Sequence, residues 1–175
     1  MAKIVPPMNF GLVEDGFYRS AQPSELNFSF LEKLNLRTII WVGAEEPSEI
    51  FLSFLDSQGI KLHNLAPQRI RSSLCYGFVD HLPPLPPPPE PLIIQSLTLL
   101  LKPTTFPTLV CCNMGRHRTG TVVGCYRKLQ RWALSSILEE YRRYAGMKVR
   151  ILNEQFIELF DTDLVSITAE QAVTR

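Results

Sequence analysis

The stretch from residue 108 to residue 120, TLVCCNMGRHRTG, combines a thiol, a glycine and an arginine in a spacing that suits phosphate chemistry. Cys112 stands six residues before Arg118, with Gly115 between them and Thr119 directly after the arginine. A loop of this kind offers successive backbone N–H groups to phosphate oxygens, and a helix that begins there adds positive potential. Gly115 permits a turn with positive φ, and Arg118 supplies a planar fork for two oxygens. The stretch therefore predicts a phosphate-binding loop.

The thiol gives this loop a nucleophile. Donors that bind phosphate also favour the thiolate form of Cys112, and a thiolate can attack phosphorus to form a phosphocysteine intermediate. Thr119 would donate to the sulfur and ease its departure when water attacks. The alternative for any single cysteine is a buried core residue at the end of a strand. The combination of four matching residues in one strand-to-helix loop favours catalysis.

The rest of the loop is expected to contact the substrate, through Asn113, Met114, Gly115, Arg116 and His117. Arg116 and His117 would extend its positive rim. For His117 an internal hydrogen bond that holds the loop remains an equal alternative. Further basic residues lie in the two later helices, where most are expected to be solvated surface: Arg127, Lys128, Arg131, Arg142, Arg143, Lys148 and Arg150.

The surrounding elements predict how the loop is positioned. A turn at residues 14–16 joins two short extended pieces, and apolar runs at 37–43, 60–66 and 107–112 predict buried strands. Helices are predicted over 24–36, 47–59, 92–101, 118–132, 135–146 and 153–164, with Ser24 capping the first and Ser135 or Ser136 the fifth. Strands that alternate with helices predict an α/β fold: a single three-layer domain with a mainly parallel central sheet flanked by helices.

Length and composition set limits on the class of protein. The 175 residues suit one domain, taken as 1–165 with a proline-rich loop at about 82–91, followed by a loosely packed tail at 166–175. A net charge of +1 argues against a nucleic-acid binder. No apolar run is long enough for a membrane span, and the first ten residues do not resemble a signal peptide. Four cysteines without zinc or disulfide spacing favour a cytoplasmic protein with reduced thiols.

The chain also resembles a known family. CNMGRHRTG is similar to the signature of the cysteine-dependent protein tyrosine phosphatase superfamily, and the likeness to plant and fungal atypical dual-specificity phosphatases extends over VPPMNFGLVEDGFYRSAQP, LNLRTIIWVGAEEP and the region after the cysteine. The resemblance implies a cysteine-phosphatase type of fold, Cys112 as nucleophile, Arg118 as phosphate clamp, and no metal or other cofactor. It implies activity on phosphotyrosine or on inositol pyrophosphates. Arg19 lies in YRSAQP, a motif that recurs among members of the family, and is expected to brace the loop rather than to touch substrate.

The chain departs from the family pattern at two places. The residue before the nucleophile is usually histidine, and here it is Cys111, which removes one support for the thiolate. Cys111 is more readily interpreted as a small core residue than as a redox partner of Cys112. In addition, Asn113 and Met114 stand where related inositol pyrophosphatases carry basic residues, so a multiply charged substrate is less strongly indicated.

Related phosphatases place an aspartic acid on the loop before the penultimate helix, where it protonates the leaving oxygen. That loop corresponds to residues 67–91, whose carboxylates are Asp80 and Glu90. Asp80 is the preferred general acid, since Glu90 is expected to begin the next helix and to offset its dipole.

Seven prolines fall within residues 83–91. They predict either a stiff surface insertion, which is the simpler interpretation, or a docking site for a polyproline-binding module. Related phosphatase-like subunits are a further possible class of partner.

Together these observations predict a cysteine-dependent phosphatase that acts on an inositol pyrophosphate or a phosphotyrosyl protein. The alternative is a weakly active or inactive phosphate-binding scaffold within a complex of related proteins.

Overall fold

The protein is described by a computed structural model that covers residues 4–66 and 86–165. Five strands form one sheet in the order β1-β2-β5-β3-β4. The strands are β1 (Gly11–Glu14), β2 (Phe17–Ala21), β3 (Thr38–Trp41), β4 (Lys61–Asn64) and β5 (Thr108–Cys112). β1 pairs antiparallel with β2, and all other neighbours are parallel. The last strand in the sequence thus lies at the centre of the sheet.

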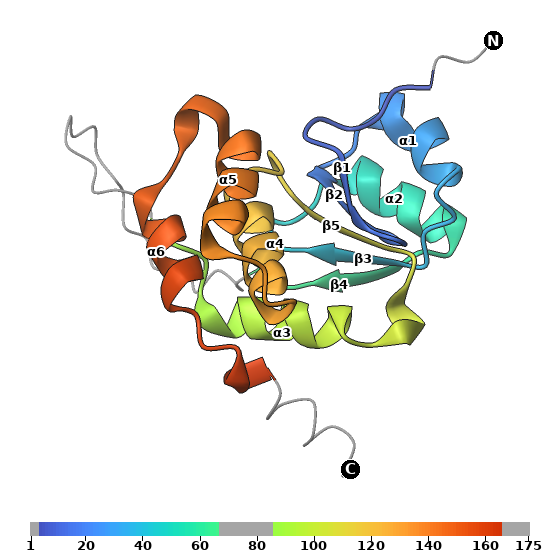
Figure 1. Ribbon diagram of the computed structural model, residues 1–175. Helices are drawn as coiled ribbons and strands as arrows, with labels where there is room; N and C mark the ends of the chain where they lie inside the picture. The colour runs from blue at the N-terminus through green and yellow to red at the C-terminus, as the bar shows by residue number, and fades with distance from the viewer. Residues whose placement is uncertain (1–3, 67–85, 166–175) are drawn as a thin grey trace, which may run out of the picture.

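Helices cover both faces of the sheet (Figure 1), as the alternating pattern predicts. They are α1 (Glu25–Glu32), α2 (Glu49–Gln58), α3 (Glu90–Leu100), α4 (His117–Leu129), α5 (Leu134–Ala145) and α6 (Ile151–Leu159), with short 3-10 turns at Pro103–Thr105 and Gly146–Lys148. α1 and α2 lie on one face and α3 to α6 on the other. The α/β class and the mainly parallel sheet are confirmed.

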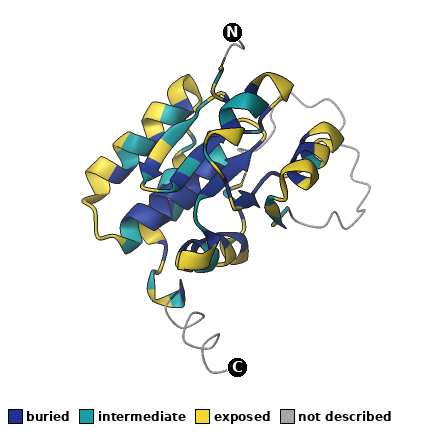
Figure 2. Ribbon diagram, turned by 90° about the vertical axis from the view of Figure 1, so that its right-hand side faces the viewer, coloured by how far each residue is buried: buried dark blue, intermediate teal, exposed yellow. Residues whose placement is uncertain are grey.

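Two apolar clusters form the core, one on each face. The cluster under α1 and α2 contains Ile39, Trp41 and Leu109 from the sheet. The cluster under the other helices contains Ile40 and Val110, the neighbours of those residues along the strands. Alternate strand residues face opposite sides, so a strand that is covered on both sides is apolar throughout. Figure 2 shows the buried residues gathered in the middle of the molecule, where β3 and β5 are buried throughout and α4 is buried from Thr119 to Arg127.

Local signals explain most element ends. Asn27 Oδ1 accepts hydrogen bonds from the backbone and hydroxyl of Ser24 at 2.9 and 3.0 Å, which confirms the predicted start of α1. Gly59 ends α2 with φ of 64°. Glu90 begins α3, as expected, although the helix starts two residues before the predicted position.

The predicted boundaries of α2, α5 and α6 are wrong. The N-cap of α5 is Ala133, because the backbone is already helical at Ser135 and Ser136, where no hydroxyl caps the helix. α6 begins at Ile151 after an extended Arg150 and ends at Leu159, before the extended Phe160. α2 begins after Ser48, whose hydroxyl accepts from the Phe51 N–H, rather than at Pro47.

Candidate active site

The predicted phosphate loop lies between the end of β5 and the start of α4, at the carboxyl edge of the parallel strands. Cys112 is the last residue of β5 and is 6% exposed. Gly115 has φ of 63°, and a Cβ placed on it would lie 2.4 Å from the backbone nitrogen of Ala21. The loop therefore turns tightly against the end of β2, which only glycine permits at this position.

Three consecutive backbone carbonyls of the loop accept hydrogen bonds from residues outside the loop. The carbonyl of Asn113 accepts from the Gln22 N–H at 3.4 Å, and that of Met114 accepts from Asn9 Nδ2 at 2.8 Å. The carbonyl of Gly115 accepts from Arg19 at 2.9 Å.

In a trans peptide the N–H points away from the carbonyl of the same unit. The amides that follow these carbonyls therefore point to the side of the loop opposite Gln22, Asn9 and Arg19. This is the orientation that a bound anion requires.

Arg19 is the buried support of the loop. It is 1% exposed, and its guanidinium lies over the Tyr144 ring at 3.6 Å. Its Nη2 binds the Gly115 carbonyl, while Nε and Nη1 have no hydrogen-bond partner among the described residues. Burial lowers the pKa of Arg19 to about 10. The expectation that Arg19 braces the loop agrees with this contact, and the buried cation is incompletely compensated.

Arg118 lies in the first turn of α4, where its side chain reaches the loop after β3. Its Nη1 donates to the carbonyls of Val42 and Gly43 at 3.4 and 3.2 Å. Burial lowers the pKa of Arg118, and the thiol of Cys112 acts in the opposite direction. The guanidinium is therefore held in place while still half-exposed, as a clamp for phosphate must be.

A pocket of about 290 Å³ opens above Cys112. Its lining combines the loop with residues from three other segments: Ala44, Pro86, Pro88, Cys112, Asn113, Met114, His117, Arg118, Arg150 and Asn153. The presence of Pro86 and Pro88 shows that part of the proline tract forms one wall of the pocket. The stiff tract is in this part a structural element of the site, which the sequence did not indicate.

His117 makes the internal contact that was one of its two predicted roles. Its Nδ1 lies 3.2 Å from the Tyr141 hydroxyl, and the residue also lines the pocket. Burial, followed by the charges of Arg150, Arg116 and Lys148, lowers the pKa of His117 to about 4. The imidazole is therefore neutral at pH 7, and three cations gather around it.

Cys111 is a core residue. It is fully buried and belongs to the cluster under α1 and α2 with Ile39 and Trp41, whereas Cys112 belongs to the opposite cluster. Burial raises the pKa of the Cys111 thiol well above its usual value. Successive strand residues project to opposite faces, so the two sulfurs do not form a redox pair in this conformation.

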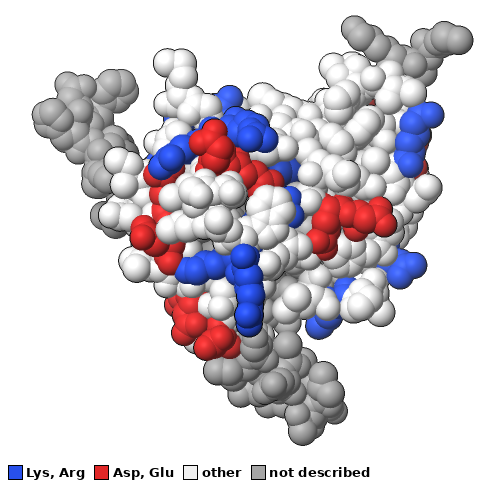
Figure 3. All heavy atoms as spheres, viewed as in Figure 1, with Lys and Arg blue, Asp and Glu red and all other residues white. Residues whose placement is uncertain are grey.

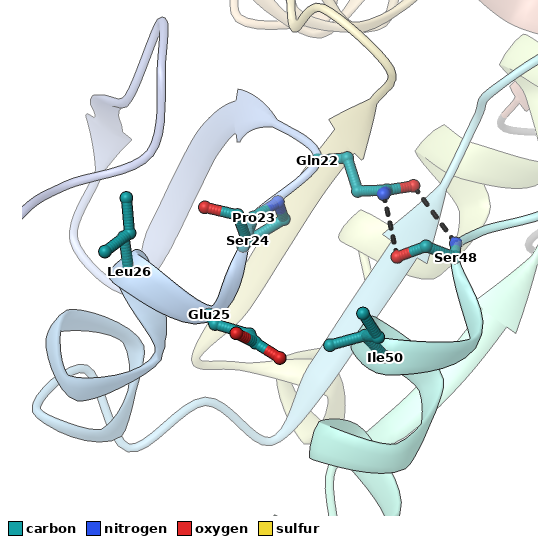
Figure 4. A pocket seen from close by; sticks show the side chains of 7 residues that line it. All are labelled: Gln22, Pro23, Ser24, Glu25, Leu26, Ser48 and Ile50. Carbon is teal, nitrogen blue, oxygen red and sulfur yellow. Dashed lines mark hydrogen bonds between the residues drawn. The ribbon is translucent and has the colours of Figure 1, made fainter.

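A second hollow adjoins the loop between the starts of α1 and α2 (Figure 4). The Gln22 side chain donates to the Ser48 hydroxyl at 2.9 Å and accepts from the Ser48 N–H at 3.3 Å. Since the Gln22 backbone also binds Asn113, this residue connects the phosphate loop to the start of α2. The start of the loop is thus bound by Gln22, directly after β2, and its end by the contacts of Arg118 with the carbonyls directly after β3.

Some predicted residues are not tested by this geometry. Asp80, the preferred general acid, and residues 83–85 of the proline tract lie outside the described residues. Thr119 lies directly after Arg118 as predicted, and its buried hydroxyl has no partner among the described residues. Met114 is 44% exposed on the loop.

The structure adds residues that the sequence did not single out for the site, namely Asn9, Tyr141, Tyr144 and Asn153. No local pattern marks them, because Asn9 contacts a residue 105 positions away and Tyr141 one that is 24 positions away. No helix within 4–66 and 86–165 is both long and apolar enough to cross a membrane.

A cysteine at the end of a central strand, a tight loop turned by a glycine with positive φ, and a fixed arginine are the arrangement expected of a cysteine-based phosphatase. The comparisons with known proteins agree. A profile described as "Tyrosine phosphatase family" matches residues 4–175. The chain belongs to this family, and it is a phosphatase.

Among relatives, the chain is 56% identical to OCA1 of Mycosarcoma maydis over 93% of this chain and 96% of that protein. It is 54% identical to DG1060 of Dictyostelium discoideum over 95% and 93%. Both are provisionally named as tyrosine-protein phosphatases. Among solved structures, the catalytic core of the PP-IP phosphatase SIW14 from S. cerevisiae has a TM-score of 0.81 and 38% identity, covering 97% of this chain and 96% of that one.

Proposed function

We propose that the protein removes a phosphoryl group from an inositol pyrophosphate through a phosphocysteine intermediate on Cys112. The observation that carries this substrate class is the set of cations around the pocket. Arg116, Lys148 and Arg150 all act on His117 strongly enough to lower its pKa, and Arg150 lines the pocket itself. A phosphotyrosyl ester carries one dianionic group, whereas an inositol pyrophosphate carries several, which such a rim would bind.

This concentration of positive charge is local. The whole chain has a net charge of +1, and on the face seen in Figure 3 basic and acidic side chains are intermixed over α5 and α6. Two cations that crowd the later helices are neutralised, since Arg142 pairs with Glu154 and Arg127 with Glu140. Arg150, in contrast, lines the pocket, where a ligand can reach it. The likeness to the PP-IP phosphatase SIW14 supports the same substrate class.

In the first step the Cys112 thiolate attacks the terminal phosphorus in line, an S–P bond forms, and the bond to the bridging oxygen breaks. The loop amides and Arg118 stabilise the charge on the equatorial oxygens. In the second step water attacks the same phosphorus, the S–P bond breaks, and inorganic phosphate leaves. Thr119 donates a hydrogen bond to the departing sulfur.

The group that leaves with the bridging oxygen is a phosphate monoester, a weaker base than a tyrosyl phenolate, so the first step depends little on a general acid. Asp80 is proposed as that acid from the sequence alone. Asp80→Asn should therefore slow hydrolysis of an aryl phosphate more than hydrolysis of an inositol pyrophosphate. Equal effects on both substrates would remove this role.

Phosphorus NMR on an inositol pyrophosphate tests the main proposal. Wild-type protein should release the β-phosphate as inorganic phosphate, and Cys112→Ser should release none while still binding tungstate, an oxyanion that mimics phosphate. A phosphotyrosyl peptide serves as the parallel substrate. If only the peptide is hydrolysed, the substrate class is wrong. If neither is hydrolysed and tungstate binds, the protein is a phosphate-binding scaffold.

A further inference from the structure

Tyr141 occupies a fixed position beneath the phosphate loop. It lies on α5, is 1% exposed and packs against the backbone of α4. A Cβ placed on Gly120 would lie 2.9 Å from its ring carbon Cδ2. The ring is therefore held by a helix turn that has room for no side chain, and its hydroxyl has a defined location.

That hydroxyl lies between α4 and the start of α6. It lies 3.2 Å from His117 Nδ1. Burial raises the pKa of Tyr141, and the Asn153 side chain and the Arg150 backbone both oppose this rise. Groups that lower the pKa of a phenol act as donors toward its oxygen, which leaves the phenolic proton for His117 Nδ1, its hydrogen-bond partner in the structure.

His117 is able to accept this proton. Because burial and three neighbouring cations keep the ring neutral at pH 7, one ring nitrogen carries a hydrogen and the other is an acceptor. If Nδ1 is the acceptor, Nε2 carries the hydrogen. The opposite tautomer would direct a lone pair at a bound anion, which is unfavourable.

We propose that the Tyr141 hydroxyl donates to His117 Nδ1 and so holds the imidazole in the Nε2–H tautomer, which donates a hydrogen bond to a phosphate oxygen of the bound substrate. The identity of the bound group rests on the proposed function, whereas the tautomer does not. Tyr141 is a positioning residue that acts through His117. An uncharged donor in this place binds an oxyanion without adding a fourth cation to the rim.

Nitrogen NMR of the histidine side chains measures the tautomer directly. The chain has three histidines, so the spectrum is sparse, and the His117→Gln variant assigns the signal of interest. At pH 7 the wild-type protein should show a neutral Nε2–H pattern for His117. Tyr141→Phe should convert this pattern into a mixture of tautomers. An Nδ1–H pattern in the wild-type protein, or an unchanged pattern in Tyr141→Phe, would overturn the proposal.

Tyr126→Phe is the matched control. It also removes a hydroxyl from a buried tyrosine on a helix, but that hydroxyl binds the Glu14 carboxylate. It should leave the His117 pattern unchanged. A similar change in both variants would mean that the pattern reports general loosening, and would also overturn the proposal.

Tungstate binding gives the functional readout. Tyr141→Phe should raise the Kd for tungstate about threefold to tenfold, which corresponds to one hydrogen bond, and Tyr126→Phe should leave it unchanged. An unchanged Kd in Tyr141→Phe refutes the contact with the anion. The NMR and tungstate results could agree with this inference while inositol pyrophosphate is not hydrolysed. That outcome would reject the proposed substrate and leave this inference intact.

Discussion

Replacing Arg19 with methionine should abolish most of the activity and leave the stability of the fold nearly unchanged. The substitution removes the hydrogen bond to the Gly115 carbonyl and the cation over Tyr144. It keeps an unbranched apolar side chain in a site that is 1% exposed. Loss of these contacts lowers the free energy of unfolding, whereas removal of a buried charge raises it. The two effects are of similar size.

The size of each contribution to the free energy of unfolding follows from the structure. A fall in pKa from 12.5 to about 10 means that burial, partly offset by the neighbouring charges, leaves the charged form about 3 kcal/mol less favourable, a cost that methionine does not carry. Against this stand the charge-assisted hydrogen bond, about 1.5–3 kcal/mol, and the contact with the Tyr144 ring, about 1–2 kcal/mol. The expected change in the free energy of unfolding is therefore within about 2 kcal/mol of zero.

Activity depends on a different property of the same residue. Without Arg19 the Gly115 carbonyl has lost its donor, and the peptide that presents the next amide to the substrate is free to turn. Loss of one preorganised donor lowers turnover by roughly 100-fold to 1,000-fold. We expect kcat for an aryl phosphate to fall in this range.

Arg127→Met is the contrasting control. Arg127 is also buried, but it pairs with Glu140 at 3.0 Å and donates to the Val13 carbonyl. Its removal leaves a carboxylate without its partner, which costs about 3–5 kcal/mol, while activity per folded molecule should be unchanged.

Urea unfolding and steady-state kinetics on the two variants provide the assay. If Arg19→Met is destabilised by more than about 4 kcal/mol, or keeps its kcat within about threefold of wild type, the reasoning fails.

Gly115→Ala should lower kcat by at least about 100-fold and abolish tungstate binding, because a Cβ 2.4 Å from the Ala21 backbone nitrogen displaces the loop. Kinetics close to those of the wild type would contradict this contact. Asn9→Ala, which frees the Met114 carbonyl, should raise the tungstate Kd about fivefold in calorimetry, and no change would mean that this carbonyl needs no donor. The pH dependence of stability tests His117, whose pKa falls from 6.5 to about 4 on folding. Between these values the unfolded chain binds the extra proton, so stability falls on acidification and His117→Gln should reduce the slope in urea unfolding; an unchanged slope would refute the shift.

The strands and the phosphate loop were predictable because their signals are local. The run at 107–112 is apolar on both faces, and the glycine of the loop is required by its backbone alone. Asp-Gly at residues 15 and 16 likewise predicts the first turn, where Gly16 has φ of 71°.

The supports of the site were harder to predict, because they depend on tertiary contacts. Asn9 is an ordinary loop residue until β2 pairs with β5 and brings it to Met114. Ser135 and Ser136 are good capping residues, yet the backbone before them sets the start of α5 at Leu134. Tyr141 was one apolar position of a helix, and only the packing of α4 against α5 gives its hydroxyl a role.

The position of β5 at the centre of the sheet has a consequence for how the chain is made. β1 pairs with β2, and β3 pairs with β4, but these two units are joined in the sheet only through β5. At roughly 5–20 residues per second, synthesis of the chain between Asn64, the end of β4, and Cys112 takes roughly 2–10 s. Throughout that interval both units present an unpaired strand edge, so the nascent chain is open to mispairing until the strand that carries the nucleophile arrives. Closing the sheet and assembling the active site are therefore a single event in biosynthesis.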